Sequence, residues 1–226
     1  MLTAIIVAAG RSRRMGFDKL FAIIAGRPVI AHAINAFEQA NSVAEIIVVA
    51  GEDRHDEIRK LSRNESFKKV RSIITGGERR QDSVRAGLEN LSRDARYVAI
   101  HDAARPLVRP EQIVRVFERC RVHGAAALAE PISDTLKRAD IDRMVTASVD
   151  RHQLYAMQTP QIFERAMIEA AYRAVPANGV SVTDEVSALE RLGGKVFLVP
   201  AEDFNFKITY RQDLALAEFV LKQRMH

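Results

Sequence analysis

The stretch LTAIIVAAGRSRRMGFDK, residues 2–19, decides the fold class that we predict for this chain of 226 residues. Residues 2–9 form a short apolar run typical of a buried β-strand, and a basic loop that contains Gly10 and Gly16 follows it. The run is too short for a membrane span and no basic segment precedes it, so we expect neither a membrane segment nor a signal peptide. In open α/β sheets ligands bind at the carboxyl ends of strands, so this loop is the expected ligand site.

The rest of the chain continues the alternation of strand and helix. Strands are predicted at residues 3–8, 46–50, 70–75, 97–101 and 196–200, with a further apolar run at 125–129. Helices are predicted at residues 29–38, 56–61, 82–91, 164–173, 184–191 and 212–224, and another is expected to begin at Pro110. This order is typical of βαβ units, so we predict one α/β domain over residues 1–226 with a twisted, mainly parallel sheet flanked by helices.

Residues 131–151 depart from this pattern. Polar residues alternate there with Ile132, Leu136, Met144 and Val149, which predicts a β-hairpin arm that stands off the domain. A hairpin of that length is marginally stable alone in water, so its apolar residues need a partner surface. A second copy of the arm is the simplest partner, and we expect a homodimer.

Composition excludes several classes of function. The net charge of +5 is compatible with nucleic-acid binding, but the chain has no Trp. Its basic residues Arg11, Arg13, Arg14 and Lys19 gather in one loop, which favours a small polyanion over nucleic acid. The single cysteine, Cys120, permits no intrachain disulfide, and no Cys/His pattern has zinc spacing, so we expect a reduced cytoplasmic compartment and no zinc site.

The basic loop suits a phosphate chain. Gly10 and Gly16 let the backbone approach phosphates closely, and Arg14 and Lys19 are placed to neutralise their charge. The spacing matches neither the ATPase loop nor the dinucleotide fingerprint. On spacing alone, a solvated basic loop remains the alternative.

A glycine pair opens the next candidate motif, GGERRQDSV, at residues 76–84. Backbone groups at Gly76 and Gly77 can contact the edge of a flat base with no side chain in the way. Asp82 or Ser83 is equally suited to cap the helix that follows, and the two roles can coexist.

The third motif, HDAARP at residues 101–106, follows another predicted strand. Asp102 suits Mg²⁺ or a sugar hydroxyl, and Arg105 suits a bidentate phosphate contact. A buried pair of these two side chains that orders the loop is the alternative. We interpret His101 as a structural histidine, and Thr183, in the run TDE, is by itself better explained as part of a helix N-terminus.

Taken in order, these motifs resemble the 2-C-methyl-D-erythritol 4-phosphate cytidylyltransferase family. The resemblance rests on the motifs AAG with RM and K (8–19), GG with DSV (76–84), HDAARP (101–106), DT (134–135), VDR (149–151), TP (159–160), TDE (183–185) and KIT (207–209). It implies a Rossmann-like nucleotidyltransferase fold, a homodimer joined through the arm, and transfer of CMP from CTP to a small sugar-alcohol phosphate. It also implies Mg²⁺ held mainly by the CTP phosphates and a role in the non-mevalonate route to isoprenoids.

The resemblance assigns roles to individual residues. The implied catalytic residues are Arg14, Lys19, Arg151 and Lys207. The implied nucleotide contacts are Ala8, Ala9, Gly10, Gly77, Glu78, Arg80 and Ser83. The implied acceptor contacts are Asp102, Arg105, Thr135, Arg151, Thr159, Thr183 and Lys207. Thr135 and Arg151 are expected to serve the opposite subunit of the dimer.

This chain departs from the family pattern at a few positions. Many members carry Pro before the loop lysine and Gln after it, whereas this chain has Asp18 and Leu20. Phe206 precedes Lys207 where Ile is frequent. Some members are fused to a cyclase domain; this chain ends at His226, so we expect a monofunctional protein.

Two other functions remain open at this point. The first is the same chemistry on ribitol 5-phosphate, because that cytidylyltransferase shares most of these motifs. The second is a non-catalytic nucleotide-binding module, because fold does not fix function. The cations of the candidate site argue against the module, since their own motifs hold no carboxylate partner for them apart from Asp18 and Asp150.

Overall fold

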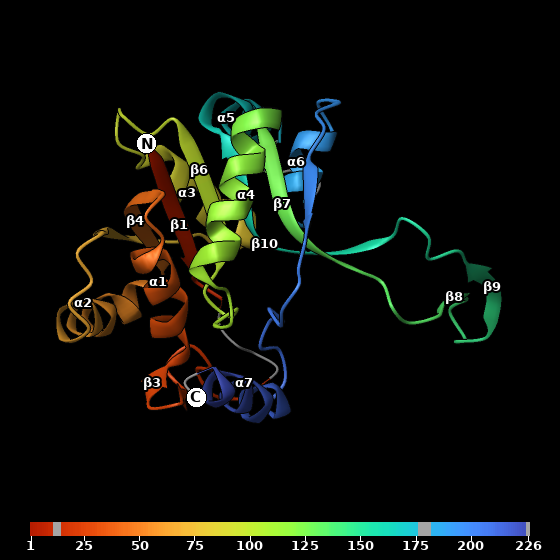
Figure 1. Cartoon of the computed structure of the whole chain (residues 1–226), viewed down its shortest axis with the longest axis horizontal. Helices are drawn as coiled ribbons and strands as arrows, with labels where there is room; N and C mark the ends of the chain where they lie inside the picture. Colours follow the sequence, from red (N-terminus) through yellow and green to blue (C-terminus); the bar gives the residue numbers. More distant parts are fainter. Residues whose placement is uncertain (11–14, 176–181, 225–226) are drawn as a thin grey trace.

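The computed structural model describes residues 1–10, 15–175 and 182–224. Within these residues, seven strands form one sheet in the order β11-β7-β10-β6-β1-β4-β5 (Figure 1). Their bounds are Leu2–Ala8 (β1), Val43–Ala50 (β4), Val70–Thr75 (β5), Tyr97–Asp102 (β6), Ala125–Pro131 (β7), Tyr155–Glu164 (β10) and Phe197–Pro200 (β11). Only β10 among them runs antiparallel to its neighbours, β6 and β7. The predicted mainly parallel sheet is confirmed.

Helices cover both faces of this sheet, because successive side chains of each strand point to opposite sides. In β4, Ile46 and Val48 belong to one apolar cluster, and Ile47 and Val49 belong to the other. The first cluster includes side chains of α1 (Val29–Gln39), α2 (His55–Asn64), α4 (Pro110–His123) and α7 (Gln212–Gln223). The second includes side chains of α3 (Arg80–Glu89), α5 (Arg165–Ala174) and α6 (Glu185–Glu190).

Helix α4 shows how local sequence sets an element's bounds. Pro110 stands at its first turn, where the missing N–H costs nothing, and Gly124 ends it at φ 80°. Ile113, Val116 and Cys120 lie on its buried face at helical spacing. The expected helix start at Pro110 is confirmed.

Several small elements were not predicted. These are a short hairpin, β2 (Ile23–Ile24) and β3 (Arg27–Pro28), and a 3₁₀ turn, η1 (Glu52–Arg54). Helix α3 begins at Arg80, two residues earlier than expected. Asp82 is therefore not the N-cap. It occupies the third helical position and accepts a hydrogen bond from the backbone N–H of Arg79 (3.2 Å).

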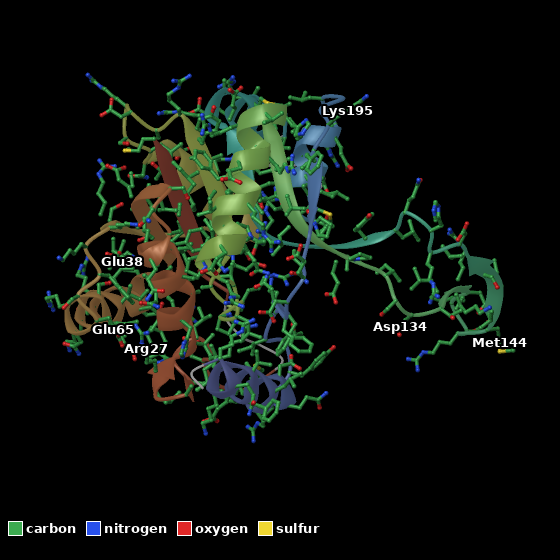
Figure 2. The ribbon with its side chains drawn as sticks, in the orientation of Figure 1. Arg27, Glu38, Glu65, Asp134, Met144 and Lys195 are labelled. Atoms are coloured by element: carbon green, nitrogen blue, oxygen red, sulfur yellow. The ribbon has the colours of Figure 1, made fainter. Side chains whose placement is uncertain are left out.

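The predicted arm is a hairpin that projects from the body of the molecule (Figure 1). Its strands β8 (Leu136–Ala139) and β9 (Val145–Val149) pair antiparallel in a small sheet of their own. Figure 2 shows Asp134 and Met144 on this arm, far from the main sheet. Ile141 at its tip is 95% exposed, so the arm presents apolar surface to its surroundings. Among the described residues, no helix has the length and apolar character needed to cross a membrane.

Candidate active site

Loops at the carboxyl ends of β1, β4, β5 and β6 meet around a cavity of about 1850 Å³. Parallel strands in register bring these loops together, since Ala8 pairs with Ala50, and Ala50 pairs with Thr75. Among the described residues, this cavity is the larger of two that lie side by side. All of the predicted nucleotide contacts line it, namely Ala8, Ala9, Gly10, Gly77, Glu78, Arg80 and Ser83. Lys19, Asp102 and Lys207 line it too. Arg14 lies outside the described residues.

The glycine pair at the end of β5 is required by close packing. A Cβ atom on Gly76 would lie 2.6 Å from the Cβ of Ala9, and one on Gly77 would lie 2.3 Å from the Cβ of Asp82. The hydroxyl of Ser83 lies within hydrogen-bond distance of the carbonyl oxygens of Gly77 (3.4 Å) and Arg79 (3.3 Å), which share its single hydrogen. The backbone at the junction between β5 and α3 is therefore packed tightly, and it forms part of the cavity wall.

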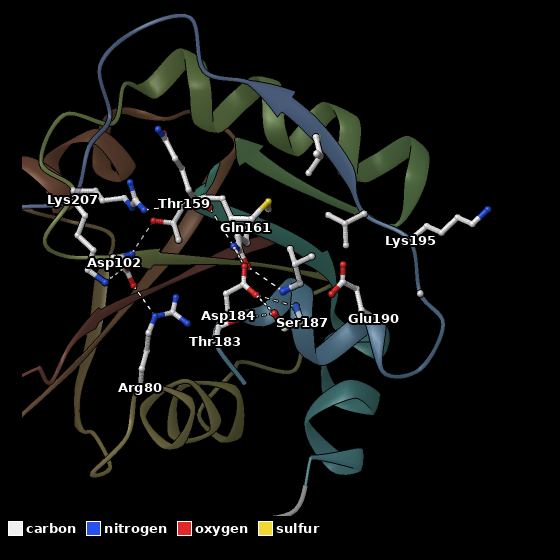
Figure 3. Close-up of a pocket in the computed structure, with 17 residues that line it drawn as sticks. Arg80, Asp102, Thr159, Gln161, Thr183, Asp184, Ser187, Glu190, Lys195 and Lys207 are labelled. Carbon is white, nitrogen blue, oxygen red and sulfur yellow. Dashed lines mark hydrogen bonds and ion pairs between the residues drawn. The ribbon is translucent and has the colours of Figure 1, made fainter. Parts of the chain in front are cut away.

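A second cavity of about 760 Å³ lies beside the first (Figure 3). It is lined by five of the predicted acceptor contacts, Asp102, Arg105, Thr159, Thr183 and Lys207. Arg80, Asp102 and Lys207 line both cavities and so form their common wall. A ligand bound in one cavity would therefore lie next to a ligand bound in the other.

The three side chains of the common wall continue into the buried Glu185, and together they form a row of alternating charges, which we call the charge row: Lys207, Asp102, Arg80 and Glu185. Lys207 Nζ lies 2.7 Å from Asp102 Oδ2, and Arg80 Nε lies 2.8 Å from Asp102 Oδ1. Arg80 then donates two hydrogen bonds to Glu185 (2.7 and 3.0 Å), whose Oε1 also accepts from Tyr172 (2.9 Å). Figure 3 shows the row from Lys207 through Asp102 to Arg80.

The charge row shifts the pKa values of Asp102 and Arg80. Burial alone would raise the pKa of Asp102, but Arg80 and Lys207 outweigh burial and hold that pKa well below its usual range. Burial alone would lower the pKa of Arg80, and Glu185 and Asp102 outweigh it and raise that pKa. Asp102 is therefore an anion at neutral pH, and it serves Lys207 as a carboxylate partner from a different motif.

The alternative of a buried Asp102–Arg105 pair was wrong. Asp102 pairs with Arg80 and Lys207, while Arg105 donates to the carbonyl oxygens of Asn205 (2.8 Å) and Met157 (3.4 Å). Arg105 still lines the smaller cavity. Burial lowers its pKa, although nearby Asp102 opposes the change.

His101 is buried behind the wall and both ring nitrogens have partners. Nε2 lies 3.2 Å from the carbonyl oxygen of Arg105, and Nδ1 lies 3.0 Å from the Thr159 hydroxyl. A carbonyl only accepts, so Nε2 donates and Nδ1 accepts from Thr159, whose oxygen in turn accepts from the N–H of Asp102 (3.1 Å). Burial lowers the pKa of His101 to about 3. The structural interpretation of this histidine is confirmed, and it orients Thr159.

Lys19 reaches from the basic loop toward the charge row. Its Nζ donates to the carbonyl oxygen of Ile208 (2.6 Å), the residue after Lys207. The two lysines therefore approach the common wall from two segments far apart in the chain. Cations fixed in this way suit a reaction between two phosphate groups, where negative charge accumulates.

Arg54 is a site residue that the sequence analysis missed. It follows β4, lines the larger cavity, and its Nε lies 2.6 Å from Asp18 Oδ2. In the sequence it stands among Glu52, Asp53 and Asp56, so its charge is typical of a solvated turn. Its place at a strand end next to β1 is the signal that would have identified it.

Two predicted acceptor contacts lie elsewhere. Thr135 and Arg151 are exposed residues of the arm, and neither lines either cavity of its own chain. Arg151 donates to the carbonyl oxygen of Ser133. Thr183 lines the smaller cavity, and the next residue, Asp184, caps α6 by accepting from the N–H of Ser187 (3.0 Å), so the helix-terminus interpretation is confirmed.

Comparison with known sequences gives matches over nearly the whole chain. Residues 2–223 match the family described as 2-C-methyl-D-erythritol 4-phosphate cytidylyltransferase. The protein of that name from Dehalococcoides mccartyi (strain CBDB1) is 40% identical over 221 residues, which are 97% of this chain and 96% of the relative. Its counterpart from Caldanaerobacter subterraneus subsp. tengcongensis is 40% identical over 229 residues, 98% of this chain and 99% of the relative.

Solved structures show the same likeness. The 4-diphosphocytidyl-2C-methyl-D-erythritol synthase of Anaerococcus prevotii superposes with a TM-score of 0.86 at 29% identity, over 98% of this chain and 96% of that chain. The 2-C-methyl-D-erythritol 4-phosphate cytidylyltransferase of Thermus thermophilus gives a TM-score of 0.80 at 29% identity, over 96% and 98% of the two chains. Fold and sequence thus point to the same group of proteins.

Proposed function

Because the chain belongs to the 2-C-methyl-D-erythritol 4-phosphate cytidylyltransferase family, we propose that it transfers CMP from CTP to 2-C-methyl-D-erythritol 4-phosphate and releases pyrophosphate. This reaction belongs to isoprenoid biosynthesis by the non-mevalonate route. The family match favours this acceptor over ribitol 5-phosphate, and an enzyme over a non-catalytic module. The observation that supports the assignment of the site is the common wall, which separates two adjacent cavities and would let a ligand in each lie beside the other.

CTP occupies the larger cavity. The backbone at Ala8, Ala9 and Gly10 approaches the triphosphate at the carboxyl end of β1, as ligands do in open α/β sheets. Gly77 and Ser83 border the base, where main-chain groups and a hydroxyl can distinguish the amine of cytosine from the carbonyl of uracil. Lys19 binds the phosphates of CTP close to Lys207, because its Nζ lies next to Ile208.

The acceptor occupies the smaller cavity. Its phosphate lies against Lys207, and its hydroxyls contact Asp102, Thr159 and Thr183. Asp102 is kept ionised by the charge row and therefore accepts hydrogen bonds from hydroxyls. Arg105 adds to the positive charge of this cavity, which Arg80, Lys195 and Lys207 also line.

The chemistry requires no general base. A phosphate monoester has a second pKa near 6 and is largely dianionic at neutral pH, so its oxygen is already a nucleophile. That oxygen bonds to the α-phosphorus of CTP, the bond from the α-phosphorus to the bridging oxygen breaks, and pyrophosphate leaves with its electron pair. The protein has to position two anions and offset the repulsion between them. Lys19 and Lys207 supply the positive charge for this.

Mg²⁺ bound to the phosphates of CTP would offset their negative charge. The described residues place no group of three or more His, Cys, Asp or Glu side chains where they could hold a metal ion. Two of the carboxylates that line the larger cavity, Asp18 and Asp102, are engaged by cations of the protein. Phosphate oxygens and water are therefore its main ligands, as is common for this ion.

The proposed assembly is a homodimer in which residues 131–151 of one subunit complete the site of the other. The support is that Thr135 and Arg151 lie on an arm away from their own cavities, and that the arm exposes Ile141, Met144 and Val145. The proposed compartment is the cytoplasm, and its support is that the only cysteine of the chain, Cys120, is a buried free thiol.

Pyrophosphate release measured with each of the four nucleoside triphosphates and with both candidate acceptors tests this function. We expect turnover with CTP and 2-C-methyl-D-erythritol 4-phosphate, and much less with ribitol 5-phosphate. Stabilisation by CTP without turnover on any sugar phosphate would contradict the proposal and favour a binding module.

A further inference from the structure

Arg54 is a charged side chain that the mechanism above does not use, and yet it is only 8% exposed. It ends η1, directly after β4, and β4 pairs with β1 so that the loops of the two strands lie side by side. The guanidinium makes contacts in two directions. Nη1 donates to the carbonyl oxygens of Ala8 (2.7 Å) and Gly10 (3.1 Å), and Nε pairs with Asp18 (2.6 Å).

These contacts hold both described ends of the basic loop. Ala8 ends β1 and Gly10 begins the loop, and Asp18 stands immediately before Lys19 at its far end. The second oxygen of Asp18, Oδ1, accepts from the N–H of Leu20 (3.1 Å), so the carboxylate also fixes the backbone around Lys19. One guanidinium thus sets the distance between the two ends of the loop.

The ion pair between Arg54 and Asp18 also neutralises one carboxylate that lines the larger cavity. Asp18 lines that cavity, and its side chain is 31% exposed. An unpaired carboxylate there would repel a triphosphate, and the buried arginine neutralises it.

We propose that Arg54 is a positioning residue for the nucleotide: it fixes the ends of the loop that carries Lys19 and neutralises Asp18 beside the triphosphate. This inference rests on the proposal that CTP binds in the larger cavity. Because Arg54 does not line the smaller cavity, its effect falls on CTP and spares the acceptor.

The test compares Arg54→Met, Asp18→Asn and the double variant by titration calorimetry with CTP and Mg²⁺, and by steady-state kinetics. We expect Arg54→Met to raise the Kd and KM for CTP by about 10- to 100-fold, because it leaves a carboxylate and two carbonyls without their donor. KM for the acceptor should change less than about twofold. In the double variant the amide no longer repels the triphosphate, so the Kd for CTP should be at least about threefold lower than in Arg54→Met.

Two further variants make the result decisive. Arg27→Met breaks an ion pair with Glu65 (2.5 Å) that lines neither cavity (Figure 2), and it should leave KM for CTP unchanged. Lys19→Ala tests the placement of CTP itself. If Lys19→Ala weakens CTP binding and Arg54→Met does not, the inference about Arg54 is overturned; if neither does, the placement of CTP is wrong.

The double variant separates positioning from general loosening. Equal Kd values for Arg54→Met and the double variant, or equal losses for CTP and acceptor, would overturn the inference. If Arg54→Met does not fold, Arg54→Lys replaces it in every comparison. It keeps a cation for Asp18, but its single nitrogen cannot occupy the positions of both Nη1 and Nε of Arg54. The same selective rise in KM for CTP is therefore expected, and its absence overturns the inference.

Discussion

The two lysines of the reaction centre are held before any substrate arrives. Lys19 donates to the carbonyl oxygen of Ile208, and Lys207 is bound by Asp102, which Arg80 grips from the other side. Charges fixed in place need little reorganisation when the transition state forms, and such preorganisation is a large part of electrostatic catalysis. We therefore expect these two side chains to contribute strongly to the rate of the proposed reaction.

Lys19→Ala should lower kcat by about 10² or more, the loss typical of removing one preorganised charge. The free energy of unfolding should change little, because a partly exposed loop cation contributes little to stability. Steady-state pyrophosphate release and a thermal melt on the same sample measure both effects. Lys60→Ala, an exposed lysine of α2, is the control; unaltered kcat in folded Lys19→Ala would remove this residue from the mechanism.

His101 should make the protein lose stability in mild acid. Its pKa is about 3 in the folded chain and about 6.5 when unfolded, so between these values the unfolded state binds a proton that the folded state does not. The free energy of unfolding should therefore fall by about 1.4 kcal/mol per pH unit below about pH 6.5 and be unaffected by His101 above it.

Chemical denaturation of the wild type and His101→Gln from pH 7.5 down to about pH 4.5 isolates this contribution. The pKa of Asp102 is held below its unfolded value of about 3.9, so the stability that its ion pairs contribute is present above that value and lost only as the pH falls below it. The variant should show a shallower slope than the wild type. Parallel slopes would mean that His101 is protonated in the folded protein.

At the scale of elements, the parallel strands and their helices follow from pattern, and β10 does not. Strands β1, β4, β5 and β6 are apolar runs that end in glycine or charged loops, the usual signature of buried parallel strands. Strand β10 contains Gln158, Thr159, Pro160 and Gln161, residues that argue against a central strand. Gln158 and Gln161 are nonetheless buried, because partners distant in sequence satisfy them.

The candidate site divides in the same way. Residues at strand ends, such as Gly77, Asp102 and Lys19, were predictable because parallel strands bring their loops to one edge. The partners of Asp102 were not, because Arg80 and Lys207 lie 22 and 105 residues away in sequence. Arg54 was missed for the same reason, since only the fold shows that its charge points inward.

The junction between β5 and α3 should set the choice of base. The wild type should prefer CTP to UTP by about 10² or more in kcat/KM, because a mismatched edge leaves groups of the site unpaired. Gly77→Ala should reduce this preference, since the new Cβ would lie 2.3 Å from that of Asp82 and push the backbone away from the base. Parallel kinetics with both nucleotides decide; equal kcat/KM for CTP and UTP in the wild type would show that the junction is only a turn and a cap.

At the scale of the whole molecule, the chain divides into a body that holds both cavities and an arm that holds two of the implied acceptor contacts. Thr135 directly precedes β8 and Arg151 follows β9 by two residues, and these two strands form the hairpin that projects from the body (Figure 1). The exposed Ile141, Met144 and Val145 give that hairpin an apolar surface suited to a second copy of itself.

Two inactive variants should restore activity when their subunits exchange. Lys19→Ala and Arg151→Ala, mixed in equal amounts, form mixed dimers in which one site has both side chains intact if the arm crosses. Half of the dimers are mixed at random exchange and each has one good site, so about a quarter of wild-type activity should return. Fluorescence transfer between labelled subunits monitors the exchange. Complete exchange with no recovered activity would show that Arg151 serves its own chain.

The common wall also ties the two binding equilibria together. Lys207 faces both cavities while it holds Asp102, so a ligand that draws it one way changes the field that the other ligand meets. Thermodynamic linkage makes such an effect reciprocal: the factor by which CTP alters the affinity for the acceptor equals the factor by which the acceptor alters the affinity for CTP. If CTP and the acceptor bind as proposed, a single lysine between the two cavities would make each of them an effector of the other as well as its co-substrate.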